Sequence, residues 1–372
     1  MSHSAGVAHF FSLFEKVVMK LELRDVSKRI GADIHIHETS LVLESGAFNV
    51  LLGATNAGKT TLMKLMAGLD TPTSGQVLYD GVDMTKAPPQ QRNISFVHQF
   101  FINYPHLSVR DNITSPLRLA KVSPSEIKRR LDETADLLRL GPMLDRRPHE
   151  LSGGQQQRCA LARAIIKDSV VVFLDEPLAN LDYKLREELR SELPGIFADR
   201  GAIVVYATSE PAEALMLGGH TAAMYEGHIA QFGSTADVYR SPANLNAAQV
   251  FSDPPLNISN VQKRANSIAL TNAFSWPAQG EAAALAEGEY TLGVRPHFVR
   301  PKPDSEAKIP LHGDVRVTEL SGSESVAHFQ LEGEVWVSQS DGLHPYKVGE
   351  RHDFYLDDSR CFYFGADGQR VV

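Results

Sequence analysis

Short apolar runs alternate with stretches of helical periodicity in the N-terminal part of the chain. Runs with the length and continuous apolar character of buried strands occupy residues 48–52, 94–97, 170–174 and 203–207. Apolar residues at helical spacing follow the first run, at Leu62, Leu65, Met66 and Leu69. A charged helix is expected over residues 183–193. Strands that alternate with helices predict a mainly parallel α/β sheet covered on both faces.

The chain begins and ends with a different pattern. Residues 21–43 show strand-like alternation, and Asp80-Gly81 predicts a tight hairpin turn within residues 78–82. Residues 105–165 are expected to be largely helical, with one helix start capped by Ser123. From residue 241 onward, short strands are expected at residues 290–294, 312–317, 325–331 and 335–337, with residues 281–289 as a solvated connector. This predicts a second, all-β, barrel-like domain.

Length and composition narrow the class of protein. The 372 residues allow two domains. The formal charge of −8 differs from the positive charge that is typical of proteins that bind nucleic acids, so no nucleic-acid partner is expected. The two cysteines, Cys159 and Cys361, suit a reducing cytosol. No apolar run reaches the roughly eighteen residues that a spanning helix needs. Residues 1–18 form a poor signal peptide and are expected to be a leader or a mis-set start without function.

Residues 53–61 carry the phosphate-binding pattern G-x-x-x-x-G-K-[ST] between the first buried strand and a helix. A chance match is expected in roughly one in a hundred chains of this length. Backbone amides of the loop can surround nucleotide phosphates, Lys59 can neutralise the β- and γ-phosphates, and Thr60 can offer its hydroxyl to Mg²⁺. The predicted nucleotide-binding residues are Gly53, Thr55, Asn56, Ala57, Gly58, Lys59, Thr60 and Thr61.

Two further motifs supply candidate chemistry. Ser152, Gly153, Gly154 and Gln155 open a predicted helix whose N-terminal amides can bind an anion. Asp175 ends the third buried strand, where its carboxylate can hold Mg²⁺, and Glu176 can orient and deprotonate an attacking water. Taken singly, such residues are more often helix caps or turns. Their order behind a phosphate loop favours the functional interpretation.

These motifs together resemble the ATP-binding subunits of ABC transporters. The resemblance implies an α/β P-loop NTPase fold with a β-rich lobe and a helical subdomain over residues 19–240, binding ATP and Mg²⁺. It implies that Gln99 senses Mg²⁺ and the γ-phosphate, and that residues 179–182, which include Asn180, form the D-loop. Ser152 to Gln155 would then contact nucleotide held by the opposite subunit.

Residues 241–372 resemble, through Gly293-Val294-Arg295-Pro296 and Glu319-Leu320-Ser321-Gly322, the OB-like (TOBE-type) domain of carbohydrate-importer ATPases. The implied partners are two transmembrane permease subunits, a second ABC ATPase subunit and, indirectly, a periplasmic solute-binding protein. The implied location is peripheral, at the cytoplasmic face of a bacterial inner membrane. The residues of these motifs are most similar to those of ATPases of glycerol or glycerol-phosphate import.

Two positions depart from the family pattern. Ser209 stands where the family places a catalytic histidine, and Ile30 where it offers an aromatic side chain to adenine. A lost hydrogen bond to a charged group costs about 1.5–3 kcal/mol, roughly ten- to a hundredfold in rate. Because both changes weaken only the chain's own site, a heterodimer is favoured over a homodimer.

Two other classes of protein stay open. A regulatory ABC subunit with a slow or vestigial site would explain Ser209, although Lys59 and Glu176 disfavour it. A soluble ABC-type ATPase of DNA repair or translation would require coiled-coil insertions or tandem phosphate loops, which this sequence lacks.

Overall fold

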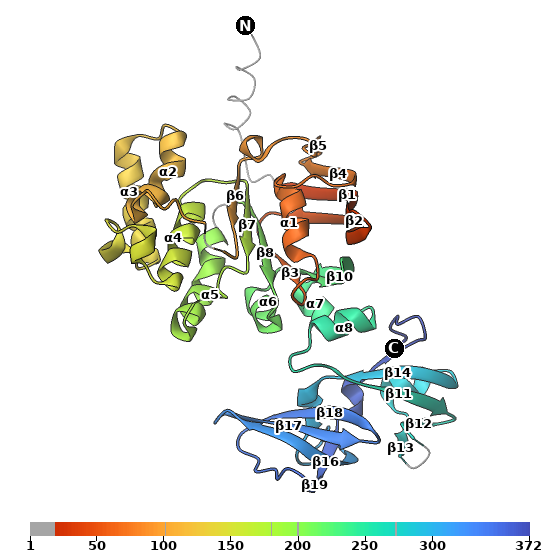
Figure 1. Cartoon of the computed structure of the whole chain (residues 1–372). Helices are drawn as coiled ribbons and strands as arrows, with labels where there is room; N and C mark the ends of the chain where they lie inside the picture. Colours follow the sequence, from red (N-terminus) through yellow and green to blue (C-terminus); the bar gives the residue numbers. More distant parts are fainter. Residues whose placement is uncertain (1–18, 101, 180, 199–200, 272–273) are drawn as a thin grey trace. The chain divides into compact units, whose positions relative to one another are not determined.

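The computed structural model describes residues 19–100, 102–179, 181–198, 201–271 and 274–372. The predictions made for residues 1–18 and for Asn180 therefore lie outside the described residues. The chain divides into two compact units, one ending at Thr235 and the other spanning Ala236–Val372 (Figure 1). Among the described residues, none of the helices combines the length and apolar content needed to traverse a lipid bilayer.

A six-stranded sheet forms the centre of the first unit, in the order β10-β9-β3-β8-β7-β6. Its strands are β3 (Phe48–Leu52), β6 (Ile94–Val97), β7 (Val171–Asp175), β8 (Ile203–Thr208), β9 (His220–Tyr225) and β10 (His228–Ser234). All neighbours pair in parallel except β9 and β10, which form an antiparallel hairpin. β3, β7 and β8 are buried along their whole length, as the continuous apolar runs predicted.

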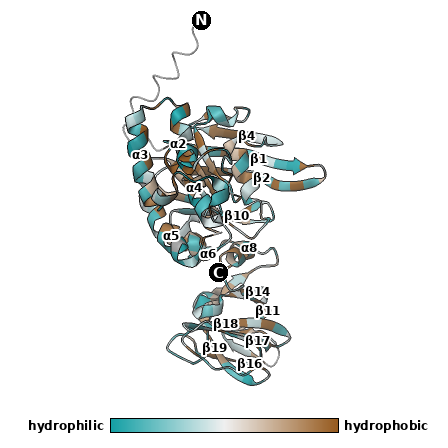
Figure 2. Ribbon diagram, turned by 60° about the vertical axis from the view of Figure 1, so that its left-hand side comes forward, coloured by the Kyte–Doolittle hydropathy of each residue, from teal (hydrophilic) through white to brown (hydrophobic). Residues whose placement is uncertain are grey.

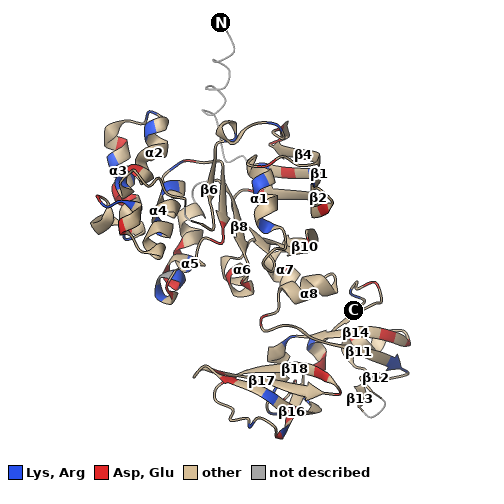
Figure 3. Ribbon diagram, viewed as in Figure 1, with Lys and Arg blue, Asp and Glu red and all other residues tan. Residues whose placement is uncertain are grey.

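Helices surround this sheet and form a separate lobe (Figure 1). They are α1 (Lys59–Ala67), α2 (Val109–Leu119), α3 (Pro124–Leu137), α4 (Gly153–Ile165), α5 (Tyr183–Ala198) and α6 (Pro211–Leu217), whereas α7 (Thr235–Arg240) begins at the unit boundary. The Ser123 side chain caps α3 by accepting a hydrogen bond from the Glu126 amide, as predicted. Basic and acidic residues are interleaved on α3 (Figure 3), where Arg129 pairs with Glu126 and Glu133 at 2.6 and 2.7 Å.

A four-stranded antiparallel sheet packs beside the central sheet, in the order β2-β1-β4-β5. Its strands are β1 (Lys20–Ile30), β2 (Asp33–Glu44), β4 (Ser74–Tyr79) and β5 (Val82–Asp83). The predicted turn at Asp80-Gly81 joins β4 to β5. Hydrophobic and hydrophilic positions alternate along β1 and β2 (Figure 2), so one face of each strand is buried.

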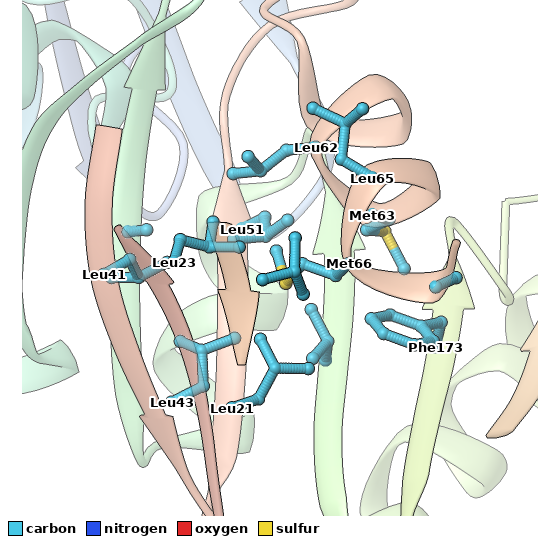
Figure 4. Packing of buried hydrophobic residues seen from close by; sticks show 14 of the residues in the cluster. Leu21, Leu23, Leu41, Leu43, Leu51, Leu62, Met63, Leu65, Met66 and Phe173 are labelled. Carbon is cyan, nitrogen blue, oxygen red and sulfur yellow. The ribbon is translucent and has the colours of Figure 1, made fainter. Parts of the chain in front are cut away.

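The core of the first unit lies between the two sheets and α1. Leu62 and Met66 of α1 point toward Leu51 of β3 and toward the leucines of β1 and β2, with Phe173 of β7 closing one side (Figure 4). All of these side chains are buried. α1 ends at Gly68, whose φ of 70° terminates the helix, so Leu69 is 46% exposed instead of continuing the predicted apolar face.

The second unit is almost entirely antiparallel β structure. One sheet has the order β13-β12-β11-β14-β20 and the other β15-β19-β16-β17-β18. The strands are β11 (Asn257–Arg264), β12 (Ser267–Ala269), β13 (Ser275–Pro277), β14 (Gly288–Val294), β15 (Val299–Arg300), β16 (Ile309–Leu320), β17 (Glu324–Leu331), β18 (Glu334–Asp341), β19 (Arg351–Leu356) and β20 (Phe362–Phe364), preceded by α8 (Leu245–Val250). Both sheets contribute to one hydrophobic core, which is consistent with the expected OB-like domain.

The prediction of a solvated connector over residues 281–289 is wrong. A 3₁₀ helix spans Gly280–Ala284, and Ala282 and Leu285 are buried in the core of the second unit. The Ala- and Glu-rich composition concealed two inward-facing apolar positions, because the segment is too short to show a periodicity.

Candidate nucleotide site

The phosphate loop connects β3 to α1, and two of its glycines are required by geometry. A Cβ atom on Gly53 would lie 2.5 Å from the carbonyl oxygen of Met224. Gly58 caps α1 with a φ of 101°, and a Cβ there would lie 2.8 Å from Ile36 Cδ1. The loop backbone can therefore approach β2 and β9 only because these positions lack side chains.

Lys59 begins α1 and is only 5% exposed. Its Nζ donates hydrogen bonds to the carbonyl oxygens of Gly53 at 2.7 Å and Ala54 at 3.0 Å, and lies 3.4 Å from Glu176 Oε1. Burial lowers the pKa of Lys59, while the carboxylates of Glu176 and Asp175 oppose that shift. The ammonium group is thus held inside the loop, where a phosphate can replace the carbonyl oxygens.

Thr60 and Asp175 lie together although 115 residues separate them. The Thr60 hydroxyl is 2.9 Å from each oxygen of the Asp175 carboxylate. Asp175 ends β7, is 2% exposed, and has its pKa raised by burial. A hydroxyl beside a carboxylate is a hard-oxygen donor set, so these two residues fit Mg²⁺, which takes few protein ligands next to nucleotide phosphates.

Gln99 and Glu176 follow two neighbouring parallel strands, β6 and β7. Gln99 Nε2 donates to Glu176 Oε2 at 2.8 Å. Glu176 has a positive φ of 46°, and its amide donates to the carbonyl oxygen of Ala207 at 3.0 Å. The backbone of β8 therefore fixes the turn that carries the Glu176 carboxylate.

Lys59, Thr60, Gln99 and Glu176 line one cavity of about 580 Å³, whereas Asp175 is not among the lining residues and is connected to them through Thr60. The lining residues are Asp33, Ile34, His35, Thr55, Asn56, Gly58, Lys59, Thr60, Thr61, Gln99, Glu176, Glu226 and Gly227. The five residues of the β2 start and the β9–β10 turn were not predicted, since no motif connects these segments to the loop. A cavity of about 630 Å³ in the second unit, against β11 and β14, contains none of the motif residues.

Ser209 follows β8 and is exposed, and it is not among the residues that line the cavity. The residue before it is firmly held: Thr208 donates its hydroxyl to Glu213 at 2.7 Å, and the Thr208 carbonyl accepts from the Gly53 amide at 3.3 Å. Tyr206 also donates to Glu213, whose pKa is raised by burial. The strand end that carries Ser209 is thus bonded directly to the phosphate loop.

Ser152, Gly153, Gly154 and Gln155 begin α4 and do not line the cavity. Ser152 and Gln155 form a capping box, in which the Ser152 hydroxyl accepts from the Gln155 amide at 3.4 Å and the Gln155 side chain accepts from the Ser152 amide at 3.0 Å. The local structure explains why a serine and a glutamine stand three residues apart. Ser152 and Gly153 are exposed residues.

Ile30 ends β1, pairs with Asp33 of β2, and is 52% exposed. It is not among the residues that line the cavity. The side chain that stands in the position of the family's adenine-stacking aromatic therefore does not form the wall of the site.

The fold and this set of phosphate-loop, carboxylate and glutamine groups define a P-loop ATPase of the ABC type. The ABC transporter family matches residues 36–179. The sn-glycerol-3-phosphate import ATP-binding protein UgpC of Ruegeria pomeroyi is 36% identical over 313 residues, 84% of this chain and 87% of that protein. The maltose/maltodextrin import ATP-binding protein MalK of Yersinia pestis is 34% identical over 355 residues, 93% of this chain and 95% of that protein. The chain belongs to the ATP-binding subunits of ABC transporters, and it is an ATP-binding ABC ATPase.

Solved structures agree with this assignment. A dimeric, post-hydrolysis state of the ATP-binding cassette MJ0796 bound to ADP and Pi has a TM-score of 0.53 and 27% sequence identity, covering 58% of this chain and 98% of that chain. A second dimeric structure of the same bacterial ABC transporter cassette has a TM-score of 0.54 over the same shares.

Proposed function

We propose that this chain is the ATP-hydrolysing subunit of an ABC importer for a small polyol or sugar-like solute, with glycerol or glycerol phosphate favoured. The observation that carries the ATPase part is the convergence of Lys59, Thr60 and the Gln99–Glu176 pair on one cavity, with Asp175 hydrogen-bonded to Thr60. The solute class is supported by the relatives named for sn-glycerol-3-phosphate and maltose import.

Each residue has a distinct role in this proposal. The loop amides of Gly53 to Gly58 and the Lys59 ammonium bind the phosphates, and Thr60 and Asp175 hold Mg²⁺. Mg²⁺, when bound, neutralises charge that develops on the β- and γ-phosphates. Glu176 orients the attacking water and accepts its proton, while Gln99 holds the Glu176 carboxylate and senses the γ-phosphate.

A second subunit completes each site in the proposed mechanism. Ser152 to Gln155 would contact nucleotide held by the opposite ATPase subunit, and Ser209 would contact the γ-phosphate of this chain's own nucleotide. The proposed assembly has two transmembrane permease subunits and two ATPase subunits, peripheral to the cytoplasmic face of a bacterial inner membrane, and receives solute from a periplasmic binding protein. Residues 19–240 would bind nucleotide, and residues 241–372 would form a TOBE-type regulatory domain.

Ser209 and Ile30 favour a heterodimer in which this chain's own site is slow. A hydroxyl reaches less far than an imidazole, so Ser209→His should raise turnover of the complex only modestly. Ser152→Arg spoils the partner's site and should nearly stop turnover. Mass spectrometry of the co-purified transporter tests the composition, and two copies of this chain without a second ATPase would refute the heterodimer.

The solute is tested on the assembled transporter in proteoliposomes with its binding protein. ATP hydrolysis that rises on addition of glycerol 3-phosphate or glycerol, and not of maltose, would support the favoured solute class. Stimulation by maltose alone would overturn it. Hydrolysis that no solute changes and no permease requires would favour the soluble, non-transport class of ABC ATPase.

A further inference from the structure

The wall of the cavity opposite the catalytic groups is built by two segments that carry no nucleotide motif. They are residues 33–35 at the start of β2 and residues 226–227 at the β9–β10 turn. Of the lining residues in the described part of the chain, His35 alone carries an aromatic ring. Its side chain is exposed toward solvent, so the ring is free to meet a ligand.

Backbone hydrogen bonds hold this wall against the phosphate loop. The Gly227 amide donates to the carbonyl oxygen of Ala57 at 3.1 Å, and the Gly227 carbonyl accepts from the His37 amide at 3.0 Å. Cβ atoms on Gly58 and on Gly227 would lie 3.2 and 2.7 Å from the His35 carbonyl oxygen. The backbone of His35 therefore packs closely against Gly58 and Gly227, and this packing fixes the position from which the His35 side chain extends.

The direction in which a nucleotide lies in the cavity follows from the chemistry of its two ends. The terminal phosphate must approach Glu176, which is bonded to Gln99 and lies 3.4 Å from Lys59. The nucleoside must then leave the loop on the other side, toward residues 33–35 and Glu226. A purine that extends in this direction comes into the space beside the His35 ring.

Two neighbouring side chains, Ile30 and His37, are not available to stack on the base. Ile30 is not among the lining residues, and it has no ring. His37 lies two residues further on the same face of β2, but its ring stacks on His228 with centroids 3.5 Å apart. His35 is thus the aromatic group that remains available to the base.

We propose that His35 forms the adenine platform of this chain, in place of an aromatic side chain at position 30. The imidazole stacks on the base, and the carboxylates of Asp33 and Glu226 can accept hydrogen bonds from ribose hydroxyls or from the amino group of adenine. This inference rests on the proposed ATP-hydrolysing function. It means that a residue of β2, and not the residue at position 30, contributes most to the affinity for the base.

The test compares ATP with inorganic tripolyphosphate, which carries the phosphates without the base. Calorimetric titration of the intact purified chain should show that His35→Ala weakens ATP binding about tenfold, as expected for a lost stack. Tripolyphosphate binding should be unchanged, and His35→Phe should restore the ATP affinity. His37→Ala is the matched control, since it removes the same ring from the same strand outside the cavity, and it should bind ATP as the wild type does.

Several results would overturn the inference. ATP affinity that survives His35→Ala would show that the ring does not contact the base. Equal losses for ATP and tripolyphosphate, or equal losses in His35→Ala and His37→Ala, would show that the substitution acts on the loop through β2. If the wild type bound neither ATP nor tripolyphosphate, that result would contradict the proposed ATPase function as well as the proposed role of His35.

Discussion

The amide of Gln99 lies 2.8 Å from the carboxylate of Glu176, although 77 residues separate them in the chain. The other oxygen of Glu176 faces Lys59 at 3.4 Å. Both carboxylate oxygens therefore have partners in the protein, and ATP must compete for these partners when it enters. On the proposed function, phosphate binding would thereby release the Glu176 carboxylate to act on the attacking water.

Replacing Glu176 by Gln should separate nucleotide binding from hydrolysis. The amide keeps the shape and a hydrogen bond but cannot accept a proton, and loss of a general base typically lowers turnover about 10²–10⁴-fold. We expect ATP binding to remain and an ATP-bound dimer to accumulate, which light scattering after size-exclusion chromatography would detect. Unchanged hydrolysis in this variant would remove Glu176 from the role of base.

Replacing Lys59 by Ala should abolish measurable ATP binding. The ammonium makes two hydrogen bonds inside the loop, and charged hydrogen bonds to phosphate contribute about 1.5–3 kcal/mol each. We expect at least a hundredfold loss of affinity by calorimetry. Lys64→Ala, on the same helix and outside the cavity lining, is the control; comparable affinities for both variants would contradict the assignment.

Asp175→Asn should stabilise the protein without nucleotide, in a pH-dependent way. Burial raises the pKa of Asp175 above its ordinary value, so the folded state binds this proton more tightly than the unfolded state. The resulting penalty is present above the raised pKa and disappears as the pH falls below about 3.8. The melting temperature of Asp175→Asn should exceed that of the wild type near pH 7 and converge with it in acid.

The same variant should lose stabilisation by ATP and Mg²⁺, because it lacks a ligand charge. Thermal melts with and without the nucleotide would show both effects in one experiment. A wild-type protein that melts above Asp175→Asn at neutral pH without nucleotide would contradict the burial argument.

The aromatic stretch after Gln99 gives a prediction for the permease contact. Phe100 is 81% exposed, whereas the Tyr104 ring lies under the Arg163 guanidinium at 4.9 Å. We expect Phe100→Ser to release the chain from its permease in co-purification while leaving the melting temperature unchanged. Tyr104→Ser should lower the melting temperature, because it removes a cation–π contact worth about 0.5–1 kcal/mol. Retention of Phe100→Ser on the permease would place the contact elsewhere.

The elements that could be predicted from sequence are those with a local cause. β3 and β6 were predicted with the bounds that the structure shows, because short apolar runs of strand length are typical of strands in a covered sheet. The Ser123 cap and the Asp80-Gly81 turn were also predicted, since side-chain and φ preferences act within a few residues. That Lys59 and Glu176 lie in one site was predicted from the family resemblance, because no local pattern connects the two residues.

What could not be predicted depends on distant contacts. His35 has no sequence signal, because its place in the cavity arises from backbone bonds that connect β2, Gly227 and the loop. Ser152 and Gln155 form a capping box at the start of α4, and the same two residues belong to the motif that resembles the ABC family. The serine–glutamine spacing therefore has a local structural explanation besides the one that the resemblance implies. The burial of Leu285 depends on a barrel core assembled from strands far along the chain.

Two backbone hydrogen bonds connect the end of β8 to the site: the Ala207 carbonyl accepts from the Glu176 amide, and the Thr208 carbonyl accepts from the Gly53 amide. Neither bond involves the side chain of the next residue, Ser209, which is exposed. A substitution at position 209 is therefore expected to leave these two backbone hydrogen bonds in place. On the proposed role of Ser209, the hydrolysis rates of the two sites in a heterodimer could then evolve separately, because the backbone frame of this site does not depend on that side chain.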